Sequence, residues 1–286
     1  MHNHLQKSGA GRVTVQLWPD KTKFLHAYAE RWLANEAENI AFLRLSPHTF
    51  TADALCFSLH NEQGEMVQTA VFTPNDQIIL TNGTDDSTST LCTYLVEQGH
   101  EVPGLFAPVP TSRLAAKLLQ DLTGKQYHLA KELLHLELKQ PPKSRSVDGT
   151  CQAATSQDLD HLTNHRIAIQ AKSNTQRPFD SAKSVRSDIR DGALYQWVSG
   201  SGQIVASGSI YYDRMPTSAY LNHIYVEPTH RRQGYATALV SQLCEDAQAQ
   251  ERVPRLSVDA ANQPAYQAYL KLGFALAARM DNFRAM

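Results

Sequence analysis

One stretch constrains the fold more than any other, because residues 220–240 are predicted to form a strand, a short polar turn and a helix. The β-branched and aromatic run ends at Val226, Pro228 stops it, and apolar residues recur at helical spacing from Gly234 onward. The turn would present unpaired backbone N–H groups at a helix N-terminus, where the macrodipole favours negative charge, beside Arg231 and Arg232. The pattern therefore predicts a phosphate site.

The motif in the turn narrows the kind of phosphate ligand. The chain has neither Gly-x-x-x-x-Gly-Lys-Ser/Thr nor Gly-x-Gly-x-x-Gly. It has Arg/Gln-x-x-Gly-x-Gly/Ala, filled by Arg231, Gly234 and Ala236, which resembles the pyrophosphate loop of the GNAT superfamily of acyl-CoA-dependent N-acyltransferases. Residues 262–274 resemble a second signature of that superfamily, Asn-x-x-Ala-x-x-x-Tyr-x-x-x-Gly-Phe. The two motifs together extend the resemblance over roughly the C-terminal half.

The resemblance implies acetyl-CoA as the cosubstrate, with no metal. It places the departing sulfur beside the hydroxyl of Tyr269, which would protonate it. It also implies that backbone amides at the end of the strand contact the carbonyl and the pantetheine, and preorganised amides there would stabilise an oxyanion. The expected contacts with the cosubstrate are Ile224, Tyr225, Val226, Arg231, Arg232, Gln233, Gly234, Tyr235, Ala236, Thr237, Asn262 and Tyr269.

The general base is not fixed by the motifs. Some GNAT enzymes use a strand glutamate, but the matching position here is Tyr220. Strand alternation predicts Asn222 on the face of Tyr220 and His223 on the opposite face. His223 is a candidate catalytic residue because the unperturbed imidazole pKa is about 6.5, although a single strand histidine is more often structural. A water relay or an already neutral amine are the alternatives.

Composition excludes several classes of function. The formal net charge is -1, which gives no overall field to attract nucleic acid or an anionic membrane. The four cysteines show no metal-ligand or disulfide spacing, and they predict free thiols. Residues 1–9 do not resemble a secretory signal, and no 18-residue apolar run occurs. These observations predict a cytoplasmic protein.

The order of predicted elements indicates an α/β chain with mixed sheets and two domains. Residues 150–286 are expected to form a GNAT N-acetyltransferase domain, and the Pro-rich, polar residues 141–149 to form a linker. Residues 1–140 show a similar order of elements without a pyrophosphate loop, so they are interpreted as a GNAT-like or degenerate domain; an unrelated α/β domain is the alternative. In this half, Asp20 and Thr111-Ser112 are predicted helix caps, Gly124 is predicted to end the helix that Thr111-Ser112 begins, and residues 127–138 are predicted to form a long strand. A helix through residues 36–43 is expected to end before Pro47, and the last strand of the chain is expected over residues 274–280. In the family that the chain resembles, the segment matching residues 172–179 shapes the acceptor pocket.

The predicted function is transfer of an acetyl group from acetyl-CoA to a primary amine by direct attack on the thioester. No Cys or Ser stands in a nucleophile setting. The acceptor is a small-molecule amine or a protein amine, and the sequence does not choose between them or specify an oligomeric state. The alternative is a catalytically silent acyl-CoA-binding regulatory protein.

Overall fold

The structure, a computed structural model, describes residues 13–45, 50–143, 146–171, 180–212 and 216–286. Contacts between residues divide the chain into two compact units. Unit 1 comprises residues 1–135, 258–262 and 276–286, and unit 2 comprises residues 136–257 and 263–275. Each unit therefore contains segments that are far apart in the sequence, and the linker expected at residues 141–149 stays a prediction.

Unit 1 contains a mixed sheet with helices. Its strand order is β1-β2-β3-β4-β5-β12-β6, in which β4 and β5 are parallel and β12 pairs antiparallel with β5. The elements are β1 (Thr14–Trp18), α1 (Lys21–Leu33), α2 (Glu36–Leu43), β2 (Leu55–His60), β3 (Met66–Thr73), β4 (Gln77–Leu80), α3 (Asp85–Glu97), β5 (Gly104–Pro108), α4 (Thr111–Thr123), β6 (Tyr127–Leu138) and β12 (Phe274–Ala285).

Helix α1 forms for reasons visible in the sequence. The Asp20 side chain accepts a hydrogen bond from the Lys23 amide and caps the helix, as predicted. Aromatic residues at helical spacing then face the unit interior, where the rings of Phe24 and Trp32 lie 5.6 Å apart and those of Trp32 and Phe42 lie 5.0 Å apart. This aromatic cluster fixes α1 and α2 against the sheet.

The helix cap predicted at Thr111-Ser112 is wrong. Helix α4 begins at Thr111 with Pro110 in the cap position, and no side chain caps it. Thr111 is thus the first helical residue, and its hydroxyl bonds Asn82 at 2.9 Å instead of an amide of its own helix. At the other end Gly124 ends α4 in the left-handed conformation (φ 74°), as predicted.

The N-terminus of α3 occupies the position in unit 1 that the predicted phosphate loop has in the C-terminal half. Here the Thr84 hydroxyl accepts a hydrogen bond from the Ser87 amide, and Asp85 and Asp86 fill the first turn. The cap satisfies one amide and the two carboxylates repel a second anion. The start of α3 is therefore unsuited to an anion, and the expectation that residues 1–140 lack a cofactor loop stays a prediction.

Unit 2 repeats the order of elements in unit 1. Its strand order is β7-β8-β9-β10-β11, antiparallel from β7 to β10, and β10 pairs parallel with β11. The elements are β7 (Thr150–Ala153), the 3₁₀ turn η2 (Ser156–Asp158), α5 (Leu159–Gln170), α6 (Ser181–Arg190), β8 (Leu194–Val198), β9 (Ile204–Tyr211), β10 (Ser218–Val226), the 3₁₀ turn η3 (Pro228–His230), α7 (Tyr235–Ala249), β11 (Val253–Asp259) and α8 (Gln263–Leu272).

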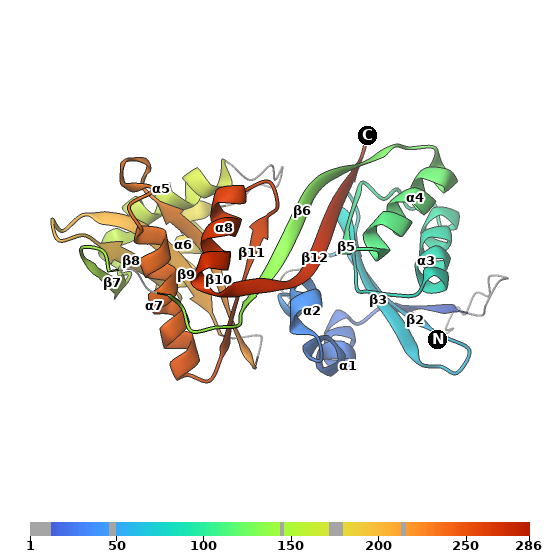
Figure 1. The fold of residues 1–286 in the computed structure, drawn as a ribbon. Coiled ribbons are helices and arrows are strands. Elements are labelled where there is room, and N and C mark those ends of the chain that lie inside the picture. The colour runs from blue at the N-terminus through green and yellow to red at the C-terminus, as the bar shows by residue number, and fades with distance from the viewer. Residues whose placement is uncertain (1–12, 46–49, 144–145, 172–179, 213–215) are drawn as a thin grey trace. The chain divides into compact units, whose positions relative to one another are not determined.

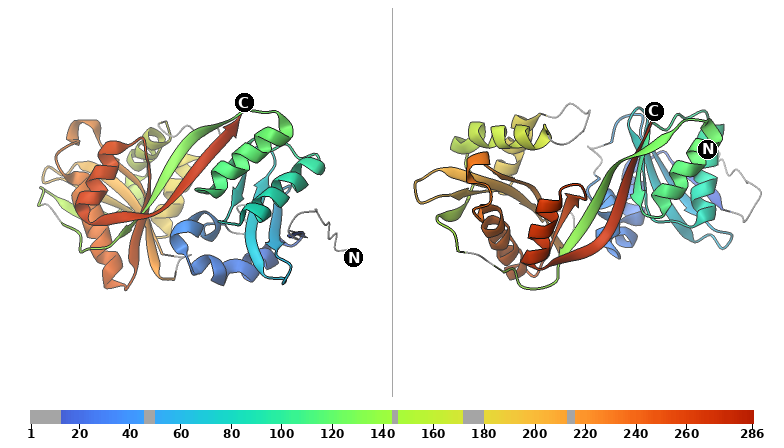
Figure 2. Two further views of the ribbon diagram at one scale, coloured as in Figure 1. Left: turned by 45° about the vertical axis from the view of Figure 1, so that its right-hand side comes forward. Right: turned by 45° about the horizontal axis from the view of Figure 1, so that its top comes forward.

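Helices cover both faces of the unit 2 sheet. Helices α5 and α6 lie on one face, and α7 and α8 lie on the other, as Figure 1 and the right-hand view of Figure 2 show. Buried Leu239 and Leu243 of α7 pack near Gly208 of β9. On the other face, Leu162 and Val185 from α5 and α6 form a small core with Leu194. Each face of the sheet is therefore covered by an apolar helix surface.

Most predicted elements agree with the structure to within one or two residues. The last strand was expected to end at Met280, but β12 continues to Ala285 because residues 280–284 pair with β5. The helix that was predicted to end before Pro47 is α2, which ends at Leu43. The segment 172–179, to which the family resemblance assigns the acceptor pocket, lies outside the described residues.

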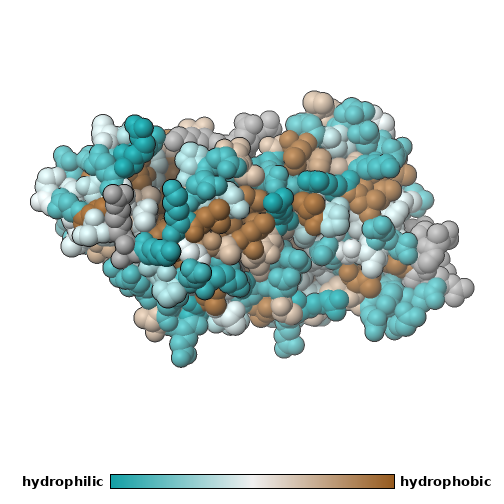
Figure 3. Space-filling model, viewed as in Figure 1, coloured by the Kyte–Doolittle hydropathy of each residue, from teal (hydrophilic) through white to brown (hydrophobic). Residues whose placement is uncertain are grey.

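The surface mixes hydrophilic and hydrophobic residues on the face shown in Figure 3. No helix among the described residues has the length and apolar character that crossing a bilayer requires. The four cysteines are free, as predicted.

Candidate active site

The predicted strand β10 is broken by a bulge. Asn222 pairs with Ser209 and Tyr225 pairs with Ser207, so residues 223 and 224 oppose only Gly208. His223 takes a left-handed conformation (φ 55°), and its amide donates to its neighbour's side-chain oxygen, Asn222 Oδ1, at 2.9 Å. Bulges re-aim side chains and end regular pairing. This one includes Ile224, the first of the strand residues predicted to contact the cosubstrate.

Gly208 lies opposite the bulge, and its lack of a side chain leaves room for Ile224. A Cβ atom at this position would lie 2.5 Å from Ile224 Cδ1 and 3.4 Å from Leu239 Cδ2. Ile224 therefore packs across the space that the glycine leaves open, which directs its side chain toward α7.

We expect Gly208→Ala to destabilise the protein by about 1–3 kcal/mol, because the added methyl group overlaps the Ile224 side chain. Ile224→Val removes the Cδ1 atom, so the double variant should lose less stability than the sum of the two single variants. Chemical denaturation of the four proteins measures this coupling. Strictly additive losses would show that Ile224 does not fill the space beside Gly208.

Beyond the bulge, one edge of β10 has no strand partner within the described residues. Its parallel pairing with β11 runs only from Ser218 to Leu221, although β10 continues to Val226. The Glu227 amide donates to Val205 O on the β9 side, so the preceding amide, that of Val226, points to the opposite, open edge. An open strand edge can donate hydrogen bonds to a carbonyl or amide group of a ligand.

The loop after β10 leads into a helix whose N-terminus lacks a cap. Gly234 occupies the cap position with φ 99°, contributes no side chain, and the first turn of α7 contains no acidic residue. The first helical hydrogen bond runs from the Ala238 amide to Gly234 O, so the amides before Ala238 have no partner inside the helix. These amides and the helix dipole together favour an anion.

Two arginines stand at this helix start. Arg231 Nε donates to Val226 O at 3.1 Å, and its guanidinium lies 5.9 Å from the Tyr225 ring centroid. Arg232 adopts a left-handed conformation (φ 62°). Neither arginine forms an ion pair with a carboxylate in the part of the chain that the structure describes. Positive charge at a helix N-terminus is unfavourable without an anion, so the loop is electrostatically suited to a phosphate.

A cavity of about 490 Å³ lies between the start of α7 and helix α8. It includes Thr237, one of the predicted contacts, and two lysines that the motifs did not indicate, Lys143 and Lys271. Its full lining is Lys143, Thr237, Pro264, Gln267, Ala268, Lys271 and Leu272. Lys143 and Lys271 thus add positive charge to that of the loop formed by residues 231–234, the arginine loop.

Tyr269 lies on α8 with its ring packed edge-on against Phe274, at a centroid distance of 5.9 Å. Its hydroxyl has no hydrogen-bond partner among the described residues. Burial, with smaller contributions from Cys244 and Tyr220, raises the pKa of Tyr269 to about 12. The hydroxyl therefore keeps its proton at neutral pH and can act as a donor.

The predicted orientation of His223 is wrong because of the bulge. Tyr211 pairs with Tyr220 across the strands, so their side chains share one face of the sheet. His223 Nδ1 lies 3.4 Å from the Tyr211 hydroxyl, which puts the imidazole on this face and not on the opposite one. Simple alternation fails because the extra residue of a bulge resets the order of inward and outward side chains.

A buried polar network connects to His223 through the Tyr211 hydroxyl. The Tyr211 hydroxyl donates to Asp188 Oδ2 at 2.9 Å, and the same oxygen accepts from Arg166 Nη2 at 2.7 Å and from Ser209 Oγ at 3.0 Å. Burial and the negative charge of Asp188 raise the pKa of Tyr211 to about 12, so it remains a donor. Arg166 and Asp188 were not predicted as site residues, because only the fold brings α5, α6 and β9 together.

His165 forms a second polar group on this face. Its Nδ1 lies 2.8 Å from Ser207 Oγ and its Nε2 lies 2.8 Å from Glu227 Oε1. The order Ser–His–Glu resembles that of a hydrolase triad, but Ser207 is only 3% exposed in the middle of β9. A substrate cannot reach a hydroxyl at that depth, which agrees with the prediction that no serine acts as a nucleophile.

The structure places most predicted site residues in one continuous segment of unit 2. Residues 223–226 form the bulge and the open edge, residues 231–237 form the loop and first helical turn, and Tyr269 lies on α8. Asn262 precedes α8 within the segment 258–262 of unit 1, and its amide donates to Asp259 O at 2.8 Å.

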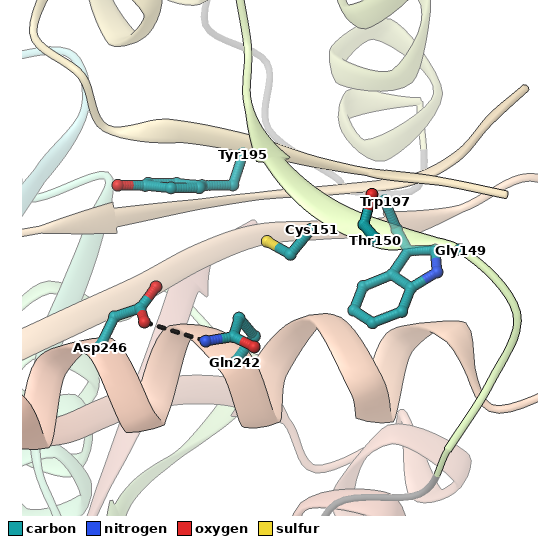
Figure 4. A pocket seen from close by; sticks show the side chains of 7 residues that line it. All are labelled: Gly149, Thr150, Cys151, Tyr195, Trp197, Gln242 and Asp246. Atoms are coloured by element: carbon teal, nitrogen blue, oxygen red, sulfur yellow. Dashed lines mark hydrogen bonds between the residues drawn. The ribbon is translucent and has the colours of Figure 1, made fainter. Parts of the chain in front are cut away.

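A second cavity, of about 440 Å³, contains none of these residues (Figure 4). Its lining comes from β7, β8 and α7, with Cys151, Tyr195 and Trp197 above Gln242 and Asp246. Burial, together with the negative charge of Asp246, raises the pKa of Cys151 to about 12, so this thiol is a poor nucleophile at neutral pH.

Comparison with protein families assigns the segment that contains this site. Residues 162–274 match the model of the Acetyltransferase (GNAT) family. These residues form a GNAT-family domain. The matched segment includes the bulge, the arginine loop and Tyr269. Members of this family use acyl-CoA, which supports acyltransferase activity in general terms. Comparison with curated proteins gives no significant match.

Solved structures extend the likeness to nearly the whole chain. A GNAT-family acetyltransferase from Colwellia psychrerythraea is 17% identical, with a TM-score of 0.65 over 95% of this chain and 99% of that chain. A GCN5-related N-acetyltransferase from Sphaerobacter thermophilus is 16% identical, with a TM-score of 0.63 over 94% and 95%. A tandem GNAT protein from the clavulanic acid biosynthesis pathway is 13% identical, with a TM-score of 0.56 over 94% and 97%. At these identities the likeness shows the GNAT fold alone.

Proposed function

We propose that this protein is an N-acetyltransferase that moves the acetyl group of acetyl-CoA to a primary amine. The observation that carries the proposal is the continuous run from the open edge of β10 to the uncapped, arginine-flanked start of α7. One end of this run suits a carbonyl and an amide, and the other suits a pyrophosphate. Acetyl-CoA carries these groups in that order.

The residues that would hold the cosubstrate follow from this geometry. The amides of residues 234–237 and the guanidinium groups of Arg231 and Arg232 would bind the pyrophosphate, and Lys143 and Lys271 would face the remaining phosphate. The open edge at residues 224–226 would bind the pantetheine and the thioester oxygen. The Val226 amide points to this edge, so it is the first candidate donor to the oxyanion.

His223 is the proposed general base. Because the Tyr211 hydroxyl uses its proton on Asp188, its oxygen can only accept from His223, which places the imidazole proton on Nδ1. The basic lone pair is then on Nε2, the tautomer that a base requires. Asp188 and Tyr211 act as positioning residues in this proposal, since neither needs to contact the amine.

The transfer can be written with these groups in place. His223 accepts a proton from the ammonium form of the acceptor, and the neutral nitrogen attacks the thioester carbon. The carbon–sulfur bond breaks as Tyr269 donates its proton to the departing sulfur. The nitrogen loses its second proton as the amide forms, and this proton restores Tyr269 through solvent, while the proton on His223 is released to solvent. At pH 7 an alkyl ammonium with a pKa near 10.4 is neutral about once in 2,500 molecules. Its deprotonation therefore costs roughly 4–5 kcal/mol, which a base must offset.

A turnover screen tests the proposal. The protein is incubated with acetyl-CoA and a panel of small amines, amino acids and lysine-containing peptides, and free CoA thiol is measured alongside the mass of each product. We expect thiol release that depends on an amine and a product heavier by one acetyl group. Acetyl-CoA binding without turnover on any member of the panel would favour the silent binding protein.

The base is tested with the accepted amine. His223→Gln should lower kcat by about 10²-fold or more at neutral pH, with a smaller loss at high pH where the amine is already neutral. Tyr211→Phe should give a milder version of the same pH profile. The variant removes the oxygen that accepts from His223 Nδ1 and so favours one tautomer, but it leaves the imidazole in place. A loss that does not depend on pH would instead show that His223 shapes the bulge and does not accept the proton.

A further inference from the structure

Three potential metal ligands meet at the end of β10, outside the groups used in the proposed transfer. His161 and His165 lie one helical turn apart on α5, and Glu227 is the residue that follows β10. His165 Nε2 lies 2.8 Å from Glu227 Oε1, and His161 Nε2 lies 3.8 Å from the same oxygen. The ligand atoms of all three side chains lie within 4.8 Å of one another.

The spacing of these atoms is close to that of a tetrahedral metal site. Zinc bonds to imidazole nitrogen and carboxylate oxygen are about 2.0–2.2 Å long, which places neighbouring ligand atoms about 3.3 Å apart in a tetrahedron. The two observed separations bracket this value. His161 is 45% exposed, so its ring can turn toward an ion without disturbing the core.

The surroundings hold the central ligand in the orientation that a metal needs. Ser207 Oγ lies 2.8 Å from His165 Nδ1 and can accept a proton from it, so an ion that displaces the proton between Nε2 and Glu227 would meet the lone pair of Nε2. His165 is only 2% exposed, and its ring packs 4.4 Å from that of Tyr225.

A hydrogen bond between His165 and Glu227 explains only part of the cluster. It does not account for the second imidazole, whose Nε2 also faces Glu227 Oε1. The neighbouring cation, Arg166, does not compete for this carboxylate, because its guanidinium bonds Ser184 and Asp188. One carboxylate faced by two imidazoles at helical i, i+4 spacing is the ligand set of a two-histidine, one-carboxylate zinc site.

We infer that His161, His165 and Glu227 form a binding site for Zn²⁺ or a similar divalent transition metal, with a fourth position open to water. Two nitrogen ligands select this class over Mg²⁺ or Ca²⁺, which prefer oxygen. A bound ion would join α5 to the residue that begins the turn before the arginine loop. The site would therefore stabilise that junction, and its existence does not depend on the proposed acetyl transfer.

The test measures metal binding on the full chain. Calorimetric titration with ZnCl₂ counts the sites, and the visible spectrum of added Co²⁺ reports four-coordinate nitrogen and oxygen ligation. Because the chain contains twelve histidines, the number of ions alone does not locate the site. The decisive comparison is between the wild type, His161→Gln, Glu227→Gln and a control, His26→Gln, in which another exposed histidine is removed.

We expect the wild type and His26→Gln to bind one more ion than His161→Gln or Glu227→Gln. Zn²⁺ should raise the melting temperature of the first two proteins only. Ser207→Ala should retain the site with about 10- to 100-fold weaker affinity, as loss of an outer hydrogen bond to a ligand typically causes. Melting curves without metal verify that each variant is folded. If Glu227→Gln does not fold, the comparison of wild type with His161→Gln tests the inference. Equal binding by the wild type and folded His161→Gln would overturn the inference.

Discussion

Replacing Tyr269 with phenylalanine is expected to lower kcat about 10²-fold while leaving the melting temperature and the KM for acetyl-CoA nearly unchanged. The hydroxyl has no hydrogen-bond partner among the described residues, so the folded state does not depend on it. Its ring packs on Phe274, and phenylalanine preserves this contact. If the hydroxyl protonates the departing sulfur, its contribution exists mainly in the transition state, and the loss falls on kcat. Steady-state kinetics with an accepted amine measure it.

The pH dependence sharpens this test. Burial raises the pKa of Tyr269 to about 12, so the proton is present throughout the range in which the protein can be assayed. The ratio of wild-type to variant kcat should therefore stay constant from about pH 6 to pH 9, unlike the ratio for His223→Gln. Tyr266→Phe, on the same helix, is the matched control. Wild-type kcat in Tyr269→Phe would remove the residue from the mechanism and assign proton delivery to solvent.

The sequence predicted elements well where their signals are local. Asp20 and Gly124 define the ends of α1 and α4 because a carboxylate cap and a left-handed glycine act on their immediate neighbours. Thr111 was wrongly predicted as a cap, since its hydroxyl bonds Asn82, a residue 29 positions away. A cap prediction considers only the nearest amides, so it cannot detect a distant competitor for the same hydroxyl.

The candidate site was predicted where a short motif contains it, in residues 224–237 and in residues 262–274. The arginine loop and the start of α7 are contiguous, and the motif therefore contains their chemistry in a few residues. His223 was placed on the wrong face because the bulge is a feature of the pairing with β9, opposite Gly208, and alternation along β10 alone does not reveal it. A glycine inside a strand is the one local signal that could have indicated this irregularity.

The groups that the sequence did not indicate come from separate elements. Asp188 of α6 and Tyr211 of β9 meet at His223, and His165 of α5 meets Glu227. No periodicity relates these positions, which are 23 and 62 residues apart in the two directly bonded pairs. The extension of β12 has the same origin, because its residues 280–284 find their partners in β5.

Replacing Gly234 with glutamate is expected to abolish the rise in melting temperature that CoA or acetyl-CoA produces in the wild type. A ligand that binds only the folded state stabilises it by about 2.7 kcal/mol at 100 times its Kd. Glutamate at the cap of α7 would place a carboxylate where the pyrophosphate is proposed to bind, and it would occupy the uncapped amides itself. The measurement is a melting curve at increasing ligand concentration.

The control for this variant must carry the same backbone strain. Gly234 has φ 99°, a conformation that costs a residue with a side chain about 1–2 kcal/mol, so Gly234→Glu is destabilised even without ligand. Gly64→Glu is matched, because Gly64 also has a positive φ (77°), and its added Cβ would meet nothing within 4 Å. Gly64→Glu should keep the full ligand-induced shift and Gly234→Glu should lose it, although both melt below the wild type. An equal shift in the two variants would place the CoA site elsewhere, since the arginine loop could not then be the group that binds the pyrophosphate.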